Sequence, residues 1–181
     1  MGMKLGYAVV AILLVANAYQ FLERPAMPQE GEAVLVTDDD YFSVAYSLIE
    51  NANESLYVIA FEMKYYRNYP DSKPNQLVNA LIAAERRGVD VRVVTDEYLN
   101  QYGDDATAVV RLLRANGVDA KLDGSERTTH AKVLVVDGTY VLIGSTNWSH
   151  TSMEKNAEAN VLVRSRGLAK DMEAYFESLA S

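Results

Sequence analysis

The sequence predicts one domain of the α/β (α+β) class, in which a mixed β-sheet is sandwiched by helices. Two observations favour this fold. Short apolar runs rich in β-branched residues alternate with segments whose apolar residues recur at helical spacing along most of the 181-residue chain. One pair of strand-like runs is separated only by Asp137-Gly138, a dipeptide typical of tight hairpins. The length suits one domain with a short extension.

The expected strands are recognised by their apolar, β-branched and aromatic content. The run SLYVIAF at 55–61 has the composition of a buried strand, and VDVRVVT at 89–95 resembles it. The runs on either side of Asp137-Gly138 form the expected hairpin. In chain order the expected strands are 33–36, 55–61, 89–95, 118–122, 131–136, 139–143 and 160–163.

The expected helices begin and end at residues that favour helix boundaries. An acidic run, Asp38 to Asp40, precedes the first helix and is expected to cap it. Pro74 suits a first helical turn, and Gly88 and Gly117 suit helix ends. In chain order the expected helices are 42–49, 74–87, 106–115 and 168–179.

The first 22 residues differ from the rest, because Lys4 is followed by the uncharged run LGYAVVAILLVA. This run is short for a membrane span, which needs about 20 residues. The small residues at 16–18 suit signal-peptidase cleavage. We expect residues 1–22 to be a signal peptide or an N-terminal membrane anchor, with a buried core helix as a further alternative. Either favoured reading makes the protein secreted, periplasmic or membrane-anchored.

Residues 23–32 (ERPAMPQEGE) contain two prolines and read as a linker to a catalytic domain at 33–181. The chain has no cysteine and only two histidines, which excludes disulfides and disfavours thiolate or multi-histidine metal sites. We therefore expect no metal and no cofactor. The net charge of −8 repels polyanions at long range, so an enzyme acting on nucleic acid would have to concentrate its cations locally.

The residues that could carry out a reaction are concentrated in two short segments, THAKVLVVDG at 129–138 and IGSTNWS at 143–149. His130 and Lys132 are two residues apart on an expected strand, so their side chains project from the same face. The hairpin then returns Gly144 and Asn147 to their neighbourhood. Neutral imidazole can attack phosphorus, while Lys132 and Asn147 can bind non-bridging oxygens. Glycine at position 144 would let a phosphate approach the backbone closely. An acid must also protonate the leaving oxygen, and a second histidine is the natural choice.

These residues resemble the HKD signature of the phospholipase D superfamily, and the order of elements over 33–179 is similar to a single HKD half. With one motif per chain, the protein is similar to the small bacterial secreted endonuclease and the mitochondrial phospholipase D-like proteins. The resemblance implies a homodimer whose two motifs share one site. His130 of one subunit would be the nucleophile and His130 of the other the general acid, with Lys132 and Asn147 on phosphate.

Glu158, in KNAEANVLV, matches the acidic residue with which the family orients its catalytic groups, unless it is simply a solvated carboxylate. Asp137 is the motif aspartate and is expected to orient and support. Ser145 would donate to phosphate or be a structural turn serine. The expected catalytic residues are His130, Lys132, Asp137, Asn147 and Glu158, with Gly144 and Ser145 binding substrate.

Three other features have both a functional and a structural reading. His150 is expected near the rim of the pocket without a catalytic role. Trp148 would pack under the site or stack on a base. The stretch at 64–69 (KYYRNY) interleaves cations and aromatics, as in single-strand binders and as in many ordinary surface loops.

The sequence therefore predicts a metal-independent phosphodiesterase, foremost an endonuclease cleaving DNA or RNA through a covalent phosphohistidine. The alternative is a membrane-anchored phospholipase D acting on lipid phosphodiesters such as cardiolipin. A noncatalytic membrane-anchored binding module would require the loss of a motif residue, and none is missing.

Overall fold

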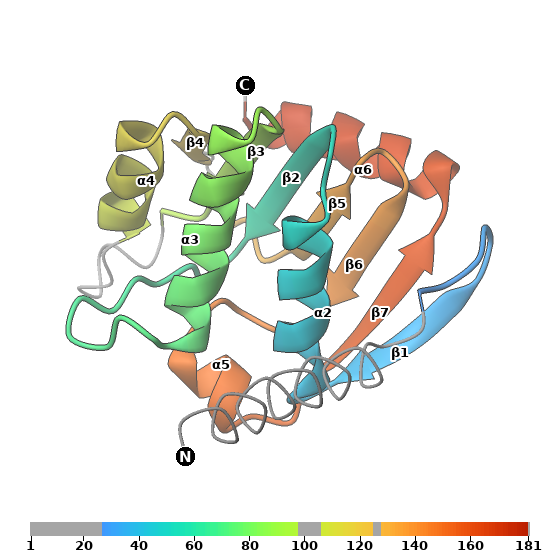
Figure 1. Cartoon of the computed structure of the whole chain (residues 1–181), viewed down its shortest axis with the longest axis horizontal. Helices are drawn as coiled ribbons and strands as arrows, with labels where there is room; N and C mark the ends of the chain where they lie inside the picture. The colour runs from blue at the N-terminus through green and yellow to red at the C-terminus, as the bar shows by residue number, and fades with distance from the viewer. Residues whose placement is uncertain (1–26, 98–105, 125–127, 181) are drawn as a thin grey trace, which may run out of the picture.

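The computed structural model describes residues 27–97, 106–124 and 128–180, which form a seven-stranded mixed sheet covered by helices (Figure 1). Across the sheet the strand order is β1-β7-β6-β5-β2-β3-β4. The β2, β3 and β4 strands are parallel, whereas all other neighbours are antiparallel. The strands are β1 (Ala33–Thr37), β2 (Ser55–Ala60), β3 (Asp90–Thr95), β4 (Asp119–Leu122), β5 (Lys132–Val136), β6 (Tyr140–Gly144) and β7 (Ala159–Arg164).

Helices cover both faces of this sheet and bury two apolar clusters. Figure 1 shows α2, α3 and α4 in front of the sheet and α6 behind it. The larger cluster, with Leu56, Leu81 and Leu142, lies on the α2 and α3 side. The smaller cluster, with Ile59, Val133 and Phe176, lies under α6. The helices are α2 (Asp40–Glu50), α3 (Lys73–Arg86), α4 (Ala106–Ala115), α5 (His150–Glu154) and α6 (Arg166–Leu179).

The predicted fold class is confirmed, and every predicted strand and helix is present. Gly88 and Gly117 adopt φ of 93° and 95° just after α3 and α4, which is the left-handed conformation expected of a glycine that ends a helix. The sequence prediction lacks only α5, because one helical turn of five residues has no periodicity to recognise.

The expectation that the acidic run caps α2 is wrong in its detail. Asp39 occupies the N-cap position but its side chain makes no capping hydrogen bond. Asp38 adopts a positive φ of 44°, and its carboxylate accepts the backbone N–H of Glu158 at 2.8 Å. The run therefore places Asp39 and Asp40 at the start of α2, as expected, but the side chain of Asp38 joins this start to the beginning of β7 and no side-chain bond of Asp39 caps the helix.

The N-terminal predictions fall largely outside the described residues. The proposed signal peptide or anchor at 1–22 and the first part of the linker at 23–32 belong to that part of the chain. Residues 27–32 form a turn in which Gly31 donates its N–H to the carbonyl of Arg164 at 2.8 Å. No helix within the described ranges is long and apolar enough to cross a bilayer.

The β5–β6 hairpin is fixed in place by Asp137. Both turn residues have positive φ, 50° at Asp137 and 54° at Gly138, as a two-residue hairpin of this kind requires. The Asp137 carboxylate accepts the backbone N–H groups of Asn53, Glu54 and Ser55 at 2.8–3.2 Å. The turn is thereby attached to the beginning of β2, which runs beside β5.

We expect Asp137→Ala to lower the free energy of unfolding by about 2 kcal/mol, because it removes charge-assisted hydrogen bonds to three backbone donors. Urea denaturation measures the loss, and Asp137→Asn, which keeps an acceptor and tolerates positive φ, should lose less. The folded fraction of Asp137→Ala should stay active. A variant of unchanged stability and no activity would show instead that Asp137 takes part in the chemistry.

Candidate active site

One end of the sheet gathers most of the predicted catalytic residues. Lys132 begins β5 opposite Ala60, the last residue of β2, and Gly144 ends β6 beside them. The segments that follow β2 and β6 also meet, since Met63 and Trp148 form a parallel bridge. The hairpin therefore brings both halves of the motif together, as the sequence predicted.

His130 and Lys132 are in direct contact. The Lys132 Nζ lies 3.1 Å from Nδ1 and 3.3 Å from Nε2 of the imidazole, and it donates to the His130 carbonyl at 2.8 Å. An ammonium group can donate only to a ring nitrogen that has a free lone pair. A nucleophilic imidazole needs the same free lone pair to attack phosphorus. His130 is exposed, so its ring can reach a substrate.

Phe61, the residue that follows β2, packs against this pair. Its ring lies 4.3 Å from the imidazole, and the Lys132 Nζ lies 4.8 Å from its centroid. Lys132 is buried, and this burial lowers the pKa of its ammonium group, while the charges of Glu158 and Glu62 act in the opposite direction. Lys132 is thus a fixed cation with few ways to move away from His130.

Glu158 is the centre of a hydrogen-bond network. Its carboxylate accepts hydrogen bonds from the hydroxyl of Ser145, from the hydroxyl of Ser152 at 2.5 Å and from the amide of Asn156 at 3.0 Å. Burial alone would raise the pKa of this carboxyl, but these three hydrogen bonds and the charge of Lys132 hold the pKa below its ordinary value. Glu158 is buried and fully engaged, so the alternative of a solvated carboxylate is wrong.

Asn147 is joined to this network through Ser152. The Ser152 hydroxyl accepts the backbone N–H of Asn147 at 2.9 Å and donates to Glu158. The side-chain Oδ1 of Asn147 is buried and has no hydrogen-bond partner among the described residues. A buried polar atom without a partner is rare, and here it leaves the amide ready to bind a group that a ligand supplies.

Ser145 and Gly144 have structural tasks. The Ser145 hydroxyl donates a hydrogen bond to Glu158 and accepts the N–H of Ala159 at 3.1 Å. Of its two expected roles, these contacts favour that of a structural turn serine. A Cβ at position 144 would lie 2.5 Å from the carbonyl oxygen of Ala159 and from the Cα of Asn160. Close approach of β7, which the sequence did not reveal, is therefore sufficient reason for the glycine.

Asp137 is not brought to the cluster. It lies at the opposite end of β5 from Lys132, roughly 16 Å away at the usual rise of a strand. Its carboxylate is occupied by the backbone of residues 53–55. Of the residues expected to be catalytic, this one can act only by positioning the hairpin.

Several supporting residues were absent from the sequence prediction. Ser152 and Asn156 reach Glu158 because α5 turns the chain back. Phe61 reaches His130 because β2 ends beside the start of β5. Asp96, at the end of β3, is buried and accepts the backbone N–H of Thr129 at 2.6 Å, which fixes the residue before His130. No spacing along the sequence could have identified these contacts.

Trp148 packs in the core, as the more ordinary of its two readings predicted. It is 3% exposed, and its indole N–H donates to the hydroxyl of Tyr41 at 2.9 Å. Burial raises the pKa of Tyr41 to about 12, so this hydroxyl stays neutral beneath the site. Because the Trp148 ring is buried, it cannot stack on a base.

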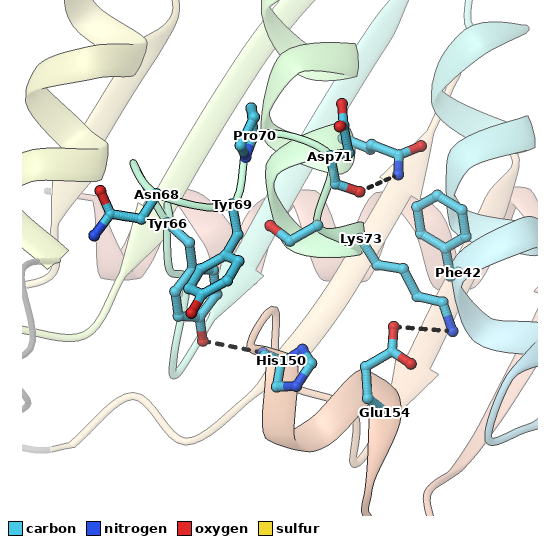
Figure 2. Close-up of a pocket in the computed structure, with 11 residues that line it drawn as sticks. Phe42, Tyr66, Asn68, Tyr69, Pro70, Asp71, Lys73, His150 and Glu154 are labelled. Atoms are coloured by element: carbon cyan, nitrogen blue, oxygen red, sulfur yellow. Dashed lines mark hydrogen bonds and ion pairs between the residues drawn. The ribbon is translucent and has the colours of Figure 1, made fainter.

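A pocket of about 830 Å³ opens beside α5, and Figure 2 shows the side chains around it. Tyr66 and Tyr69, from the cation-and-aromatic stretch, form one wall, and His150 lies beneath them with its backbone N–H donating to the Tyr66 hydroxyl at 3.0 Å. On the other side Lys73 pairs with Glu154 at 3.3 Å and with Asp39 at 3.2 Å. His150 begins α5 and lines this pocket, whose lining includes none of the predicted catalytic residues, so its expected place at the rim of the catalytic pocket stays a prediction.

The described residues contain no group of three or more histidine, aspartate or glutamate side chains arranged to hold a metal ion.

Comparisons with known proteins agree with this arrangement. Residues 46–180 match the family described as cardiolipin synthase, PLD-like domain. Mitochondrial cardiolipin hydrolase of Xenopus tropicalis is 34% identical over 141 residues, covering 78% of this chain and 61% of that protein. Phospholipase D of Rickettsia prowazekii is 30% identical over 130 residues, which cover 72% of this chain and 56% of that protein. The chain thus spans less than two thirds of the length of these curated relatives.

Solved structures show the same fold. Nuc from Salmonella typhimurium, a phospholipase D family member, superposes with a TM-score of 0.71 and 26% identity, over 82% of this chain and 93% of its own. NucT from Helicobacter pylori superposes with a TM-score of 0.64 at 17% identity, over 83% of this chain and 96% of its own.

We expect Glu158→Gln to change how stability depends on pH. The pKa of the Glu158 carboxyl in the folded protein is lowered from its ordinary value of 4.5. The ionised carboxylate therefore stabilises the folded state fully above pH 4.5, and this stabilisation is lost as the pH falls through the lowered pKa. Glu158→Gln should be less stable than wild type by about 2 kcal/mol at pH 7 and by clearly less at pH 3. Urea midpoints at the two pH values measure this.

Glu173→Gln is the matched control, because burial raises the pKa of Glu173 and its charge is not favoured in the folded state. This control should not lose stability at pH 7. If the Glu158→Gln and wild-type stabilities differed by the same amount at both pH values, the network would not be holding Glu158 ionised.

Proposed function

The chain belongs to the family of phospholipase D-like domains, and on this premise we propose that it is a metal-independent phosphodiesterase, foremost an endonuclease cleaving DNA or RNA. The observation behind this proposal is the contact of His130 with Lys132 at the sheet end where Asn147 and Glu158 also meet. These groups supply a nucleophile, a fixed cation, an amide and a carboxylate that orders them.

The proposed reaction has two steps. In the first, a ring nitrogen of His130 attacks phosphorus, a P–N bond forms, and the P–O bond to the leaving group breaks as the leaving oxygen takes a proton from an acid. In the second, a water molecule attacks the phosphohistidine, gives a proton to the same residue acting as base, and the P–N bond breaks. Both histidines return to their starting state.

Lys132 and Asn147 would stabilise the charge that develops on the non-bridging oxygens. Lys132 is held beside the nucleophile by burial and by its hydrogen bond to the His130 carbonyl. Asn147 is held through its backbone N–H by Ser152, and the NH2 group of its side-chain amide would donate to a non-bridging oxygen. Such preorganised groups lower the barrier because they need not reorient as charge builds.

The acid is inferred to come from a second subunit. The cluster contains one histidine, and His150, the other histidine of the chain, lines the pocket beside α5. One imidazole cannot be nucleophile and general acid in the same step. We therefore infer a homodimer in which His130 of the partner subunit protonates the leaving oxygen.

The pocket of Figure 2 supports nucleic acid as the substrate class. Tyr69 is 69% exposed and Tyr66 is half-buried, so both rings are available for stacking on a base. The charge of Lys73 is already neutralised by Asp39 and Glu154, so this pocket suits a flat, uncharged group and not a phosphate.

A membrane-anchored phospholipase D acting on lipid phosphodiesters such as cardiolipin is the second candidate. It is favoured by the relatives named cardiolipin hydrolase and phospholipase D, and by the apolar run at residues 5–16. Both candidates use the same cluster, and both are consistent with a secreted, periplasmic or membrane-anchored protein.

We expect the full-length protein to cleave labelled single-stranded DNA or RNA in the presence of EDTA, and His130→Asn to be inactive on the same substrates. The loss should exceed about a thousandfold, since the substitution removes the nucleophile. His150→Asn, which changes the other histidine, is the matched control and should keep a near-normal rate on bis(p-nitrophenyl) phosphate, a substrate with no base for the pocket that His150 lines.

Loss of cleavage in EDTA and its return with a divalent ion would contradict the metal-independent mechanism. Cleavage of cardiolipin vesicles without cleavage of nucleic acid would favour the second candidate.

We expect Tyr69→Ala to raise the KM for single-stranded DNA about tenfold, because stacking of one base on an aromatic ring contributes roughly 1–3 kcal/mol. The rate on bis(p-nitrophenyl) phosphate should not change, since this substrate has no base to stack. Tyr46→Ala, at a surface tyrosine of α2 outside the pocket, should leave both values unchanged. An unaltered KM in Tyr69→Ala would remove the pocket from the substrate path.

A further inference from the structure

Helix α5 is in contact with both the pocket of Figure 2 and the catalytic cluster. His150 and Glu154 are one helical turn apart and both line the pocket. Ser152, midway between them in sequence, lies on the other side of the helix. There its hydroxyl accepts the backbone N–H of Asn147 at 2.9 Å and donates to Glu158 at 2.5 Å. The catalytic cluster is the set His130, Lys132, Asn147 and Glu158.

The pocket side of α5 is weakly held. A helix of five residues has little stability of its own, because the first turn of a helix is costly to form. Lys73 pairs with Glu154 at 3.3 Å and donates to the carbonyl of Met153 at 3.4 Å. The side chains of this ion pair are 24% and 35% exposed, and such pairs contribute little to stability. The position of α5 therefore depends on few and weak contacts on this side.

The opposite wall of the pocket is firmly held. Asn75 is fully buried, and its side-chain amide accepts the backbone N–H of Tyr66 at 2.8 Å. The same amide donates to the carbonyls of Tyr66 at 2.9 Å and of Tyr69 at 3.0 Å. These hydrogen bonds fix the loop that carries the two tyrosine rings. A molecule in the pocket would therefore contact a fixed wall on one side and a weakly held helix on the other.

The pocket suits an uncharged aromatic ring with a polar edge. Its volume of about 830 Å³ is within the range of small-molecule sites, roughly 300–1,000 Å³. Phe42, Tyr66 and Tyr69 supply aromatic surface. The Ser72 hydroxyl in its lining is buried and has no hydrogen-bond partner among the described residues, so a polar atom of a ligand would satisfy it. Lys73 is already paired, which disfavours an anion. A nucleobase combines these properties.

We propose that a nucleobase bound in this pocket accelerates the reaction at the catalytic cluster by fixing α5. The proposal rests on the proposed function and extends it, because the base acts on the rate of the chemical step and not only on binding. With α5 held against the ligand, Ser152 keeps its hydrogen bonds to Asn147 and Glu158, and the groups that receive the phosphodiester are ordered before it arrives. Such coupling is reciprocal for binding, so phosphate at the cluster strengthens binding of the base.

The test is the rate on bis(p-nitrophenyl) phosphate, which has no base, measured with and without adenosine in the full-length protein. Adenosine carries no phosphate and does not compete for the cluster. Saturating adenosine should raise kcat about fivefold, the lower end of the couplings commonly found between sites. Binding of adenosine is followed by the fluorescence of Trp148, the single tryptophan, which directly precedes the N-cap Ser149 of α5.

Tyr69→Ala should lose the stimulation, because it removes an aromatic ring of the fixed wall, while its rate without adenosine stays that of wild type. Tyr46→Ala, at a surface tyrosine of α2 outside the pocket, is the matched control and should be stimulated normally.

Glu154→Ala tests the link through α5. Loss of the ion pair with Lys73 loosens the helix, so the rate without adenosine should fall about threefold and saturating adenosine should restore most of it. Asp39→Ala is the matched control, because it removes the other ion pair of Lys73 and makes no change at α5. Its rate and its stimulation should be those of wild type.

Adenosine that binds without changing the rate of wild type would overturn the proposal and leave the proposed function intact. Absence of binding, or stimulation that persists in Tyr69→Ala, would also overturn it. If the protein cleaves no phosphodiester, the proposed function fails and the coupling is measured on inorganic phosphate. Adenosine should then tighten phosphate binding about fivefold in wild type and not in Tyr69→Ala, and an unchanged affinity would refute the coupling as well.

A labelled oligonucleotide shows where the base comes from once the small substrate has been stimulated. A strand whose own base reaches the pocket gains nothing from added adenosine. A strand that does not reach it is cleaved faster in the presence of adenosine. Both results support the coupling, and they assign the base to the substrate strand or to a separate nucleoside.

Discussion

The carboxylate of Glu158 joins the segments from which the site is built. It binds Ser145 after β6, Ser152 on α5 and Asn156 just before β7, and its charge acts on Lys132 at the start of β5. Hydrogen bonds to a buried ionised group are strong. Displacing one of these segments would therefore also weaken the hydrogen bonds of the other segments to Glu158. The position of Asn147 depends on the same carboxylate through Ser152.

The acidic composition of the chain means that the site has to attract an anionic substrate locally. A protein of net charge −8 cannot attract a phosphodiester through its overall field, so the attraction must be local. Lys132 is enclosed by Phe61, His130 and the charge of Glu158, which fixes its distance from the nucleophile. The cost of burying an ammonium group is then offset by the nearby carboxylates and by a substrate that is itself an anion.

Much of this was predictable from sequence, and the limits have physical causes. Alternating patterns and turn residues identified the strands and helices, and the two-residue period placed His130 beside Lys132. Contacts made by irregular segments were not predictable, which is why Ser152 was absent and the role of Gly144 was attributed to phosphate instead of β7. Asp137 was grouped with the catalytic residues because it is the motif aspartate of the resemblance, although its predicted place in the hairpin turn, at the far end of the strand from Lys132, already separated it from them.

If two copies of His130 serve one reaction, as we propose, mixing wild-type and inactive subunits tests the shared site most directly. Wild type and His130→Asn are combined in equal amounts, allowed to exchange, and assayed at constant total protein. If a site needs both histidines, about one quarter of the wild-type rate should remain, since random pairing leaves about one quarter of the dimers with two wild-type subunits. A rate of about one half, proportional to the wild-type subunits alone, would mean that each subunit works by itself and would contradict the shared site.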